Sequence, residues 1–496
     1  MGESLKKGMA KGVFWTALSK YSSILVQLVI SMVLARLIAP EEFGVVAIAT
    51  VIIAFIYILT DLGIGPAIIQ NHELSKTDTS SIFSFTLYVG VFFSLLLFVS
   101  SNPIADFYKE VKLSTICKFL SLQVLFTTWN MVPNALFMKD KRFKFIAIRT
   151  VSLQIITGII SIIYAFNGGG CYTLIVSPIV TSILLFFIGI KEYPQKVSLK
   201  FDFAPLKKIF SFSIYQFLFN FMNYFSRNLD KLIIGKYIGM QGLGYYEKSY
   251  RLMLMPLQNV SQVIAPVIQP YFSEFQDDKT RIATYYNKIT KLIATLSFPI
   301  GVVLFYCADE LIRIFFGSNW AGAVPTFQIL ALSLPVQMIM TTSGSIYQSA
   351  NSTKAMFWNG TLNTLITISG FIINVLVSST IEAFAVAFSV TQVIEFFLSN
   401  YIMYRIVLKS SLKGFFVSMV HPAIVFVSLF VILGVTSHLI DNFNFILSFI
   451  IKCIISLLVF VTFLYIFKDY NIKDIIARLK SKKGTKQSEY NAESCR

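Results

Sequence analysis

The sequence predicts an all-α polytopic membrane protein with about fourteen transmembrane helices. Of its 496 residues, 55% are hydrophobic and 14% are charged, a balance unlike that of a soluble domain. Apolar stretches of about twenty residues, long enough to cross a hydrocarbon core roughly 30 Å thick, recur from end to end. The 48 Phe and 23 Tyr residues suit helices that contact lipid along their sides and headgroups at their ends.

The apolar stretches place the predicted helices at regular intervals along the chain. Their approximate centres are Leu25, Ile53, Phe92, Leu125, Ile156, Val180, Phe221, Leu257, Ala294, Leu334, Ile368, Phe388, Val427 and Leu457. The first stretch follows a basic segment, as in a secretory signal, but it is longer than a signal and carries Lys20 and Gln27. We therefore interpret it as the first membrane span.

Basic residues gather in alternate loops. They occur in the N-terminal segment and in residues 139–144, 191–208, 279–288, 405–413 and 473–486, whereas residues 167–170, 378–382 and 438–444 hold no Lys or Arg. Because basic loops stay on the cytoplasmic side, the pattern predicts a multi-pass inner-membrane protein with both termini in the cytoplasm. It also accounts for the net charge of +17 without nucleic acid as a partner.

The second half of the chain repeats features of the first. Residues 34–44 (LARLIAPEEFG) align without gaps on residues 234–244 (IGKYIGMQGLG), an offset of 200 that also places Pro66 on Pro266. Six predicted spans separate the copies, so both have the same orientation, as in parallel repeats. We expect a six-helix bundle in residues 1–200, a second in 201–412, and a helix pair with a basic tail in 413–496.

The seventh predicted span carries a polar stripe. Gln216, Asn220, Asn223, Arg227, Asp230 and Lys231 recur at helical spacing and share one face. The offset of 200 relates the stripe to polar residues of the first span, among them Thr16, Lys20, Ser23, Gln27 and Ser31. Two equivalent stripes predict a water-filled cavity between the bundles, and interhelical hydrogen bonds are the alternative.

Other polar residues within spans have two interpretations each. They are Asp61, Gln123, Thr127, Asn130, Arg149, Arg251, Gln258 and Gln262. Arg149 and Arg251 either contribute to the cavity or extend to the headgroups from the helix ends. Asp61 either serves transport or satisfies backbone groups freed by the break at Gly63–Pro66.

The stripe favours an anionic ligand, since Arg holds phosphate bidentately and Lys supplies a point charge. No Walker A sequence is present, so we expect neither ATP nor another cofactor. The five Cys and three His residues are isolated from one another and predict no metal site. Asp230 is a candidate for proton or sodium coupling, with an ion pair to Arg227 as its alternative role; Asp61 is the second coupling candidate.

Several motifs resemble one transporter family. They are residues 33–44 (VLARLIAPEEFG), 60–65 (TDLGIG), 228–236 (NLDKLIIGK) and 243–246 (LGYY), followed by Pro266 to Pro270. The chain resembles the polysaccharide-transport branch of the multidrug/oligosaccharidyl-lipid/polysaccharide exporter superfamily, and within it Wzx-type flippases of the colanic-acid and teichuronic-acid exporter kind. The resemblance spans nearly the whole chain.

This resemblance implies two six-helix bundles around a cavity that opens alternately to each side, with an undecaprenyl-diphosphate-linked oligosaccharide as cargo. Arg227, Lys231 and Lys20 would then hold the diphosphate, while Gln216, Asn220, Asn223 and Gln27 replace water around the sugars. A lipid II flippase or a drug/cation antiporter of the same fold is the alternative. A membrane glycosyltransferase or polymerase using Glu41 and Glu42 is disfavoured, because those enzymes carry large outer loops.

Overall fold

The computed structural model describes residues 2–61, 63–71, 74–197, 224–225, 227–273, 275–276, 278–440 and 443–467. All the labelled elements in these ranges are helices. In chain order they are α1 (Gly2–Leu37), α2 (Pro40–Asp61), α3 (Ile64–Gln70), α4 (Lys76–Tyr108), α5 (Val111–Trp129), α6 (Met131–Lys139), α7 (Phe143–Phe166), α8 (Tyr172–Glu192), α10 (Met240–Ser273), α11 (Lys279–Tyr306), α12 (Ala308–Phe315), η1 (Ser318–Ala323), α13 (Val324–Met340), α14 (Ser343–Ser349), α15 (Thr353–Val377), α16 (Ile381–Tyr401), η2 (Ile402–Val407), α17 (Leu412–Leu439) and α18 (Phe445–Phe467). Residues 227–237 are also helical.

The helices confirm the all-α polytopic fold. Within the described ranges, eleven helical segments are long and apolar enough to cross a membrane. Thirteen of the predicted centres lie in helices, and the remaining one, Phe221, lies outside the described residues. Two of the thirteen, in α5 and α10, belong to helices that are not among the eleven candidate spans. The count of fourteen spans therefore remains a prediction.

Local sequence signals explain where several helices begin. Pro40 opens α2, with Glu41 and Glu42 in its first turn, where a fixed φ and negative charge both favour a helix start. Before α4, Ser75 and Asp78 form a reciprocal capping box, which satisfies two backbone donors at that helix end. Polar caps thus set helix boundaries at points that the apolar pattern alone leaves open.

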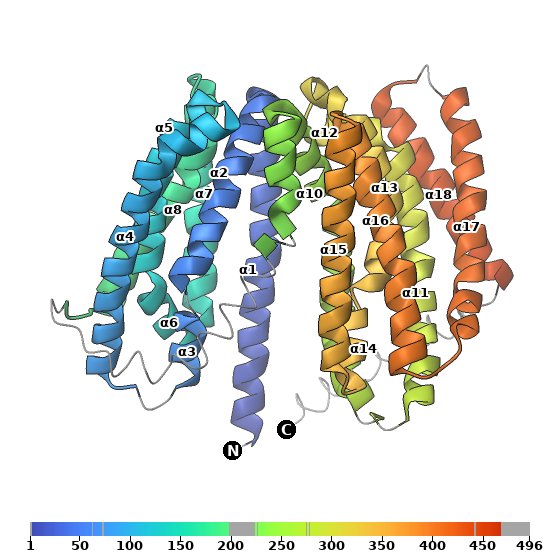
Figure 1. Cartoon of the computed structure of the whole chain (residues 1–496), viewed down its shortest axis with the longest axis horizontal. Helices are drawn as coiled ribbons and strands as arrows, with labels where there is room; N and C mark the ends of the chain where they lie inside the picture. Colours follow the sequence, from blue (N-terminus) through green and yellow to red (C-terminus); the bar gives the residue numbers. More distant parts are fainter. Residues whose placement is uncertain are drawn as a thin grey trace, which may run out of the picture. The chain divides into compact units, whose positions relative to one another are not determined.

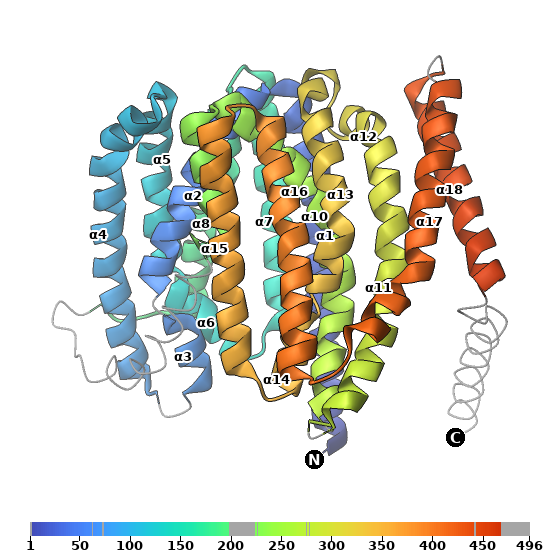
Figure 2. The same ribbon diagram turned by 45° about the vertical axis from the view of Figure 1, so that its right-hand side comes forward.

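The chain divides into two compact units. One comprises Met1–Tyr250, Ile312–Thr326 and Ile368–Ala387, and the other comprises Arg251–Leu311, Phe327–Thr367 and Phe388–Arg496. In the first unit α1 packs along α7, α4 along α5, and α5 and α7 along α8 (Figure 1). In the second, α11 packs along α17, and α18 lies beside both (Figure 2). The predicted bundle boundaries at residues 200 and 412 remain a prediction.

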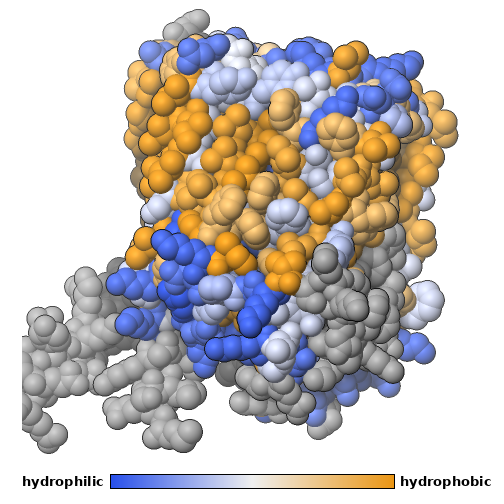
Figure 3. All heavy atoms as spheres, turned by 90° about the vertical axis from the view of Figure 1, so that its left-hand side faces the viewer, coloured by the Kyte–Doolittle hydropathy of each residue, from blue (hydrophilic) through white to orange (hydrophobic). Residues whose placement is uncertain are grey.

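The outer faces of the helices are apolar, as lipid contact requires. On α4, the exposed side chains include Val91, Phe92, Leu95, Leu96 and Val99. Figure 3 shows hydrophobic side chains in a broad band across one face of the molecule, with hydrophilic residues gathered above and below it. Such a band identifies the part of the surface that the hydrocarbon core covers.

Candidate functional site

Asp230 and Lys231, the last residues of the polar stripe in the seventh predicted span, contact the start of α10. Gly239, with a left-handed φ of 105°, joins the helical residues 227–237 to α10. The carboxylate of Asp230 accepts a hydrogen bond from the hydroxyl of Tyr246 at 3.0 Å and one from the backbone N–H of Lys231 at 2.8 Å. The ammonium of Lys231 lies 2.8 Å from the carboxylate of Glu247. Two contacts, Asp230 with Tyr246 and Lys231 with Glu247, therefore join the helical residues 227–237 to α10.

Tyr246 holds Asp230 in a rigid setting. Its side chain is fully buried, stacks on Tyr250 with ring centroids 5.8 Å apart and contacts the ring of Phe384 edge-on at 5.9 Å. Packing of this kind fixes the position of the hydroxyl, and hence of the carboxylate that accepts its hydrogen bond. These contacts give Asp230, which is only 7% exposed, partners other than the predicted Arg227.

Arg227 lies on the exposed side of the same helical segment. Its side chain is exposed, and it forms no ion pair with any residue in the described part of the chain. An unpaired guanidinium retains all its donors for a ligand. Lys231 is only 17% exposed and already neutralised by Glu247, so a ligand anion would have to compete for its charge. Arg227 is thus the more available of the two cations.

The remaining stripe residues divide into two groups. Gln216, Asn220 and Asn223 lie outside the described residues. Lys20 and Gln27 lie on α1 and are exposed, which is compatible with a surface that borders water. The cavity itself remains a prediction.

Other polar positions on α1 contact protein instead. The side-chain amide of Gln154 on α7 donates a hydrogen bond to the backbone carbonyl of Ser23 at 3.2 Å, a contact that involves no side-chain atom of Ser23. The hydroxyl of Ser31 bonds to the ammonium of Lys248 at 2.8 Å. The side-chain contact of Ser31 matches the interhelical alternative at that position.

Lys248 is a buried cation that the sequence patterns did not single out. It is 4% exposed, and its ammonium lies over the ring of Phe43, 4.1 Å from the centroid, with Phe316 and Trp320 at 5.4 and 6.0 Å. An aromatic enclosure stabilises a desolvated ammonium through the ring quadrupoles. Glu247, Ser249 and Arg251 lie next to it in the sequence, so its own segment gives no signal that this lysine is buried.

Asp61 contacts the backbone at the helix break. Its carboxylate accepts a hydrogen bond from the backbone N–H of Gly65, in the first turn of α3. The nearby Gly63 has a left-handed φ of 73°. Asp61 therefore satisfies a donor freed by the break, as in the second of its two interpretations.

Arg149 lies inside the protein rather than at the headgroups. It is 7% exposed, donates to the side-chain oxygen of Asn134 at 3.0 Å and lies over the ring of Phe137 at 4.8 Å. Two of its guanidinium nitrogens have no hydrogen-bond partner among the described residues. Arg251, by contrast, is exposed.

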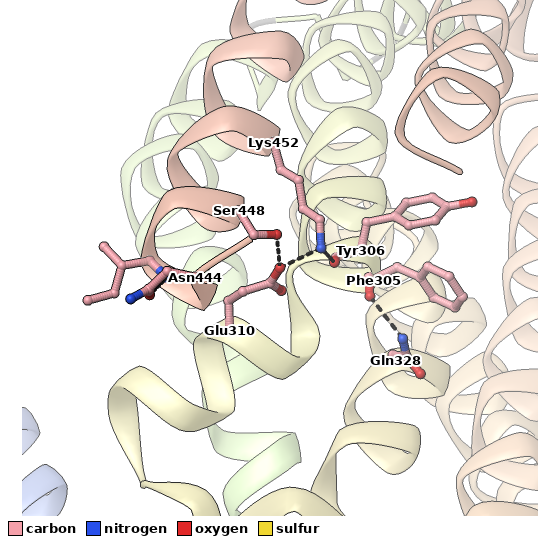
Figure 4. A network of polar contacts seen from close by, with 8 residues as sticks. Phe305, Tyr306, Glu310, Gln328, Asn444, Ser448 and Lys452 are labelled. Atoms are coloured by element: carbon pink, nitrogen blue, oxygen red, sulfur yellow. Dashed lines mark hydrogen bonds and ion pairs between the residues drawn. The ribbon is translucent and has the colours of Figure 1, made fainter. Parts of the chain in front are cut away.

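A second charged cluster joins α12 to α18. The Lys452 ammonium lies 2.5 Å from the Glu310 carboxylate and 2.9 Å from the Tyr306 carbonyl, and the Ser448 hydroxyl donates to the same carboxylate at 2.7 Å (Figure 4). Both charged side chains are buried. The buried residues of α18 are Ser448, Lys452 and Ser456, so this apolar helix turns its polar face inward. Their spacing of four residues is the signal that could have revealed the cluster.

Comparisons with known proteins identify the family. Residues 33–325 match the model of a family described as polysaccharide biosynthesis protein. The teichuronic acid biosynthesis protein TuaB of Bacillus subtilis is 23% identical over 85% of this chain and 87% of its own length. The succinoglycan biosynthesis transport protein ExoT of Rhizobium meliloti is 24% identical over 83% of each chain.

Solved structures show the fold. The lipid II flippase MurJ in an inward closed conformation superposes with a TM-score of 0.70 at 18% identity, covering 94% of this chain and all of its own. The agreement in fold and the match over more than half of the sequence confirm the resemblance drawn from the motifs. The chain is a multi-pass membrane protein that belongs to the polysaccharide biosynthesis protein family.

Proposed function

We propose that the protein is a flippase that moves an undecaprenyl-diphosphate-linked oligosaccharide across the bacterial inner membrane by alternating access, for polysaccharide biosynthesis. The observation that carries this proposal is the relationship to the transport protein ExoT, which extends over 83% of both chains. The fold shared with MurJ supports a transporter, although at 18% identity it does not indicate lipid II as the cargo.

In this proposal the polar stripe binds the charged head of the cargo. Arg227 is exposed and unpaired within the described residues, so its guanidinium is free to bind the diphosphate. Lys231 contributes when a phosphate displaces Glu247, and Lys20 contributes from α1. Gln216, Asn220, Asn223 and Gln27 hydrogen-bond the sugars, while the lipid tail stays in the bilayer.

The arrangement of the chain in the membrane is part of the same proposal. Two six-helix bundles, residues 1–200 and 201–412, enclose the cavity, and residues 413–496 add two helices and a basic tail. Both termini lie in the cytoplasm because the basic loops alternate with loops free of Lys and Arg. The diphosphate cargo enters from that side.

The function is tested by locating the lipid-linked glycan in cells that lack the gene. We expect surface polysaccharide to disappear and the lipid-linked precursor to accumulate in the cytoplasmic leaflet. In spheroplasts, an impermeant label based on galactose oxidase or periodate should then fail to reach the precursor. Restoring the gene should make the precursor accessible again. Normal surface polysaccharide in the deletion strain would refute the proposal. Rescue of a strain depleted of its lipid II flippase would instead assign lipid II as the cargo.

A further inference from the structure

Within the second unit, the N-terminal part of α15 and the C-terminal part of α16 face each other along polar side chains. On α15 these are Asn359, Asn363 and Thr367, and on α16 they are Gln392, Glu395 and Ser399. Steps of three and four residues place each set on one helical face. We call this interface the α15–α16 polar seam. Thr367 and Glu395 both lie near the middle of their candidate spans, Thr353–Val377 and Ile381–Val407.

Glu395 is the one acidic member of the seam. Its side chain is 7% exposed. One carboxylate oxygen accepts a hydrogen bond from the hydroxyl of Thr367, and the other accepts one from the amide of Gln392 at 3.3 Å. One helical turn away, the amide of Asn363 donates to the hydroxyl of Ser399 at 3.0 Å. Both partners of Glu395 are therefore neutral.

No cation in the described part of the chain faces Glu395. The charged residues of the helices packed around it lie at helix ends: Lys354 on α15, Glu382 on α16, Arg405 on η2 and Lys413 on α17. At 1.5 Å per residue, Lys354 is about 20 Å from Thr367 along the axis. α13 carries no ionisable side chain, and His421 of α17 stacks on Phe467 instead.

A second buried glutamate among the described residues, Glu310 of α12, shows what Glu395 lacks. Glu310 is paired with the ammonium of Lys452 at 2.5 Å, so its negative charge is compensated inside the protein. A carboxylate without such a partner at membrane depth is strongly disfavoured, and it becomes neutral by taking up a proton. The contrast between the two glutamates indicates that Glu395 has a role other than helix packing.

We propose that Glu395 is a proton-binding site whose carboxyl group is neutral in one state of the transport cycle and charged in another. A proton from water adds to the carboxylate oxygen to give the carboxylic acid, and it returns to water when the seam opens to the other side. The acid form has an O–H donor of its own, and the hydroxyl of Thr367 rotates to accept it. The assignment to transport rests on the proposed function, whereas the proton binding does not.

The ligand chemistry favours a proton over a metal cation. The described residues contain no cluster of three or more His, Cys, Asp or Glu side chains placed to hold a metal. A hard cation requires six or more oxygen ligands, while the carboxylate of Glu395 receives two hydrogen-bond donors. Donors stabilise a carboxylate but repel a cation, so the local geometry fits proton exchange.

Infrared spectroscopy of the purified full-length protein tests proton binding without any cargo. We expect a protonated-carboxyl band that titrates with pH in the wild type and in Glu382→Gln, a control on the same helix, but is missing in Glu395→Gln. Thr367→Val should keep the band and shift its frequency, because it removes one hydrogen bond to the carboxyl group. An unchanged band in Glu395→Gln would overturn the proposal. Loss of the band on adding NaCl, but not choline chloride, would replace the proton by sodium.

Glycan export tests the coupling separately. Glu395→Gln should insert normally and lose export on the order of tenfold or more, within the range of typical coupling free energies, while Glu382→Gln exports normally. Normal export by Glu395→Gln without its carboxyl band would overturn the role in transport while leaving the proposed flippase function intact. If the deletion strain exports normally, the proposed function fails, and the infrared result still decides whether Glu395 binds a proton.

Discussion

Gly44 and Gly244, which the 200-residue offset makes equivalent, occupy equivalent positions in one backbone crossing. A Cβ atom at Gly44 would lie 1.8 Å from the carbonyl oxygen of Met240, and a Cβ atom at Gly244 would lie 2.0 Å from the carbonyl oxygen of Pro40. Pro40 and Met240 are themselves related by the offset. Each copy of the repeat thus places its glycine against the first helical residue of the other, as a two-fold relation between the copies requires.

Alanine at either glycine should prevent correct folding. The obstacle at both positions is backbone, which cannot move aside without displacing a helix. We expect Gly44→Ala and Gly244→Ala to give little monodisperse protein by fluorescence-detected size-exclusion chromatography. Gly360→Ala on α15, where a Cβ would meet nothing within 4 Å, is the control and should behave like the wild type. Equal yields of all three variants would contradict the close crossing.

Removing one partner of the Glu310–Lys452 pair should destabilise the protein strongly. Glu310→Ala or Lys452→Ala leaves an uncompensated buried charge, at a cost of about 3–5 kcal/mol. The double variant Glu310→Leu/Lys452→Met removes both charges and should recover most of the stability. Thermal unfolding of the purified variants measures the difference.

An exposed ion pair provides the comparison for that experiment. Arg142 and Glu192 lie 2.6 Å apart, but their side chains are 37% and 35% exposed, so Glu192→Ala should change the unfolding midpoint little. If Lys452→Ala behaves like Glu192→Ala, the buried pair does not hold α18 to α12.

Arg227→Ala should abolish flipping while the protein still inserts and folds. The side chain is exposed and unpaired among the described residues, so its loss removes ligand charge rather than packing. Asp230→Asn should be milder, since an amide oxygen still accepts from Tyr246. Export assays at matched expression compare the variants with Arg405→Ala, an exposed arginine outside the stripe. Full export by Arg227→Ala would remove the diphosphate role, and pH- or sodium-insensitive export by Asp230→Asn would assign coupling to Asp230.

Cysteine labelling tests whether the stripe of the seventh predicted span borders water. Because the reactive thiolate forms poorly in hydrocarbon, Asn220→Cys and Asn223→Cys should react with small hydrophilic reagents in a cysteine-free background. Leu218→Cys and Met222→Cys, on the apolar face, should be protected. Equal protection of both faces would mean that the stripe consists of interhelical hydrogen bonds.

Reporter fusions test the predicted topology. Because basic loops stay in the cytoplasm, a fusion at Gly169 should report the outer side and one at Lys482 the cytoplasm. Alkaline phosphatase and green fluorescent protein give opposite readouts for the two sides. If both fusions report the same side of the membrane, the predicted alternation of cytoplasmic and outer loops is wrong.

The candidate site was only partly predictable from the sequence. Arg227, Asp230 and Lys231 stand out because polar residues at helical spacing are conspicuous in an apolar span. Their partners Tyr246 and Glu247 do not stand out, because aromatic and charged residues are both common in the first turns of α10. Lys452 and Glu395 are charged residues within spans, but neither belongs to the repeated stripe that drew attention to the seventh span.

The sequence by itself determined the membrane class, the all-helical fold and the approximate helix positions. These follow from local physics, because a chain in hydrocarbon must satisfy its backbone hydrogen bonds within each helix, and apolar length is therefore sufficient to place it. Only the tertiary structure decided which polar groups meet one another. Whether Glu310 faces Lys452 and Glu395 faces Thr367 depends on the rotation and packing of helices far apart in the chain, which no single helix encodes.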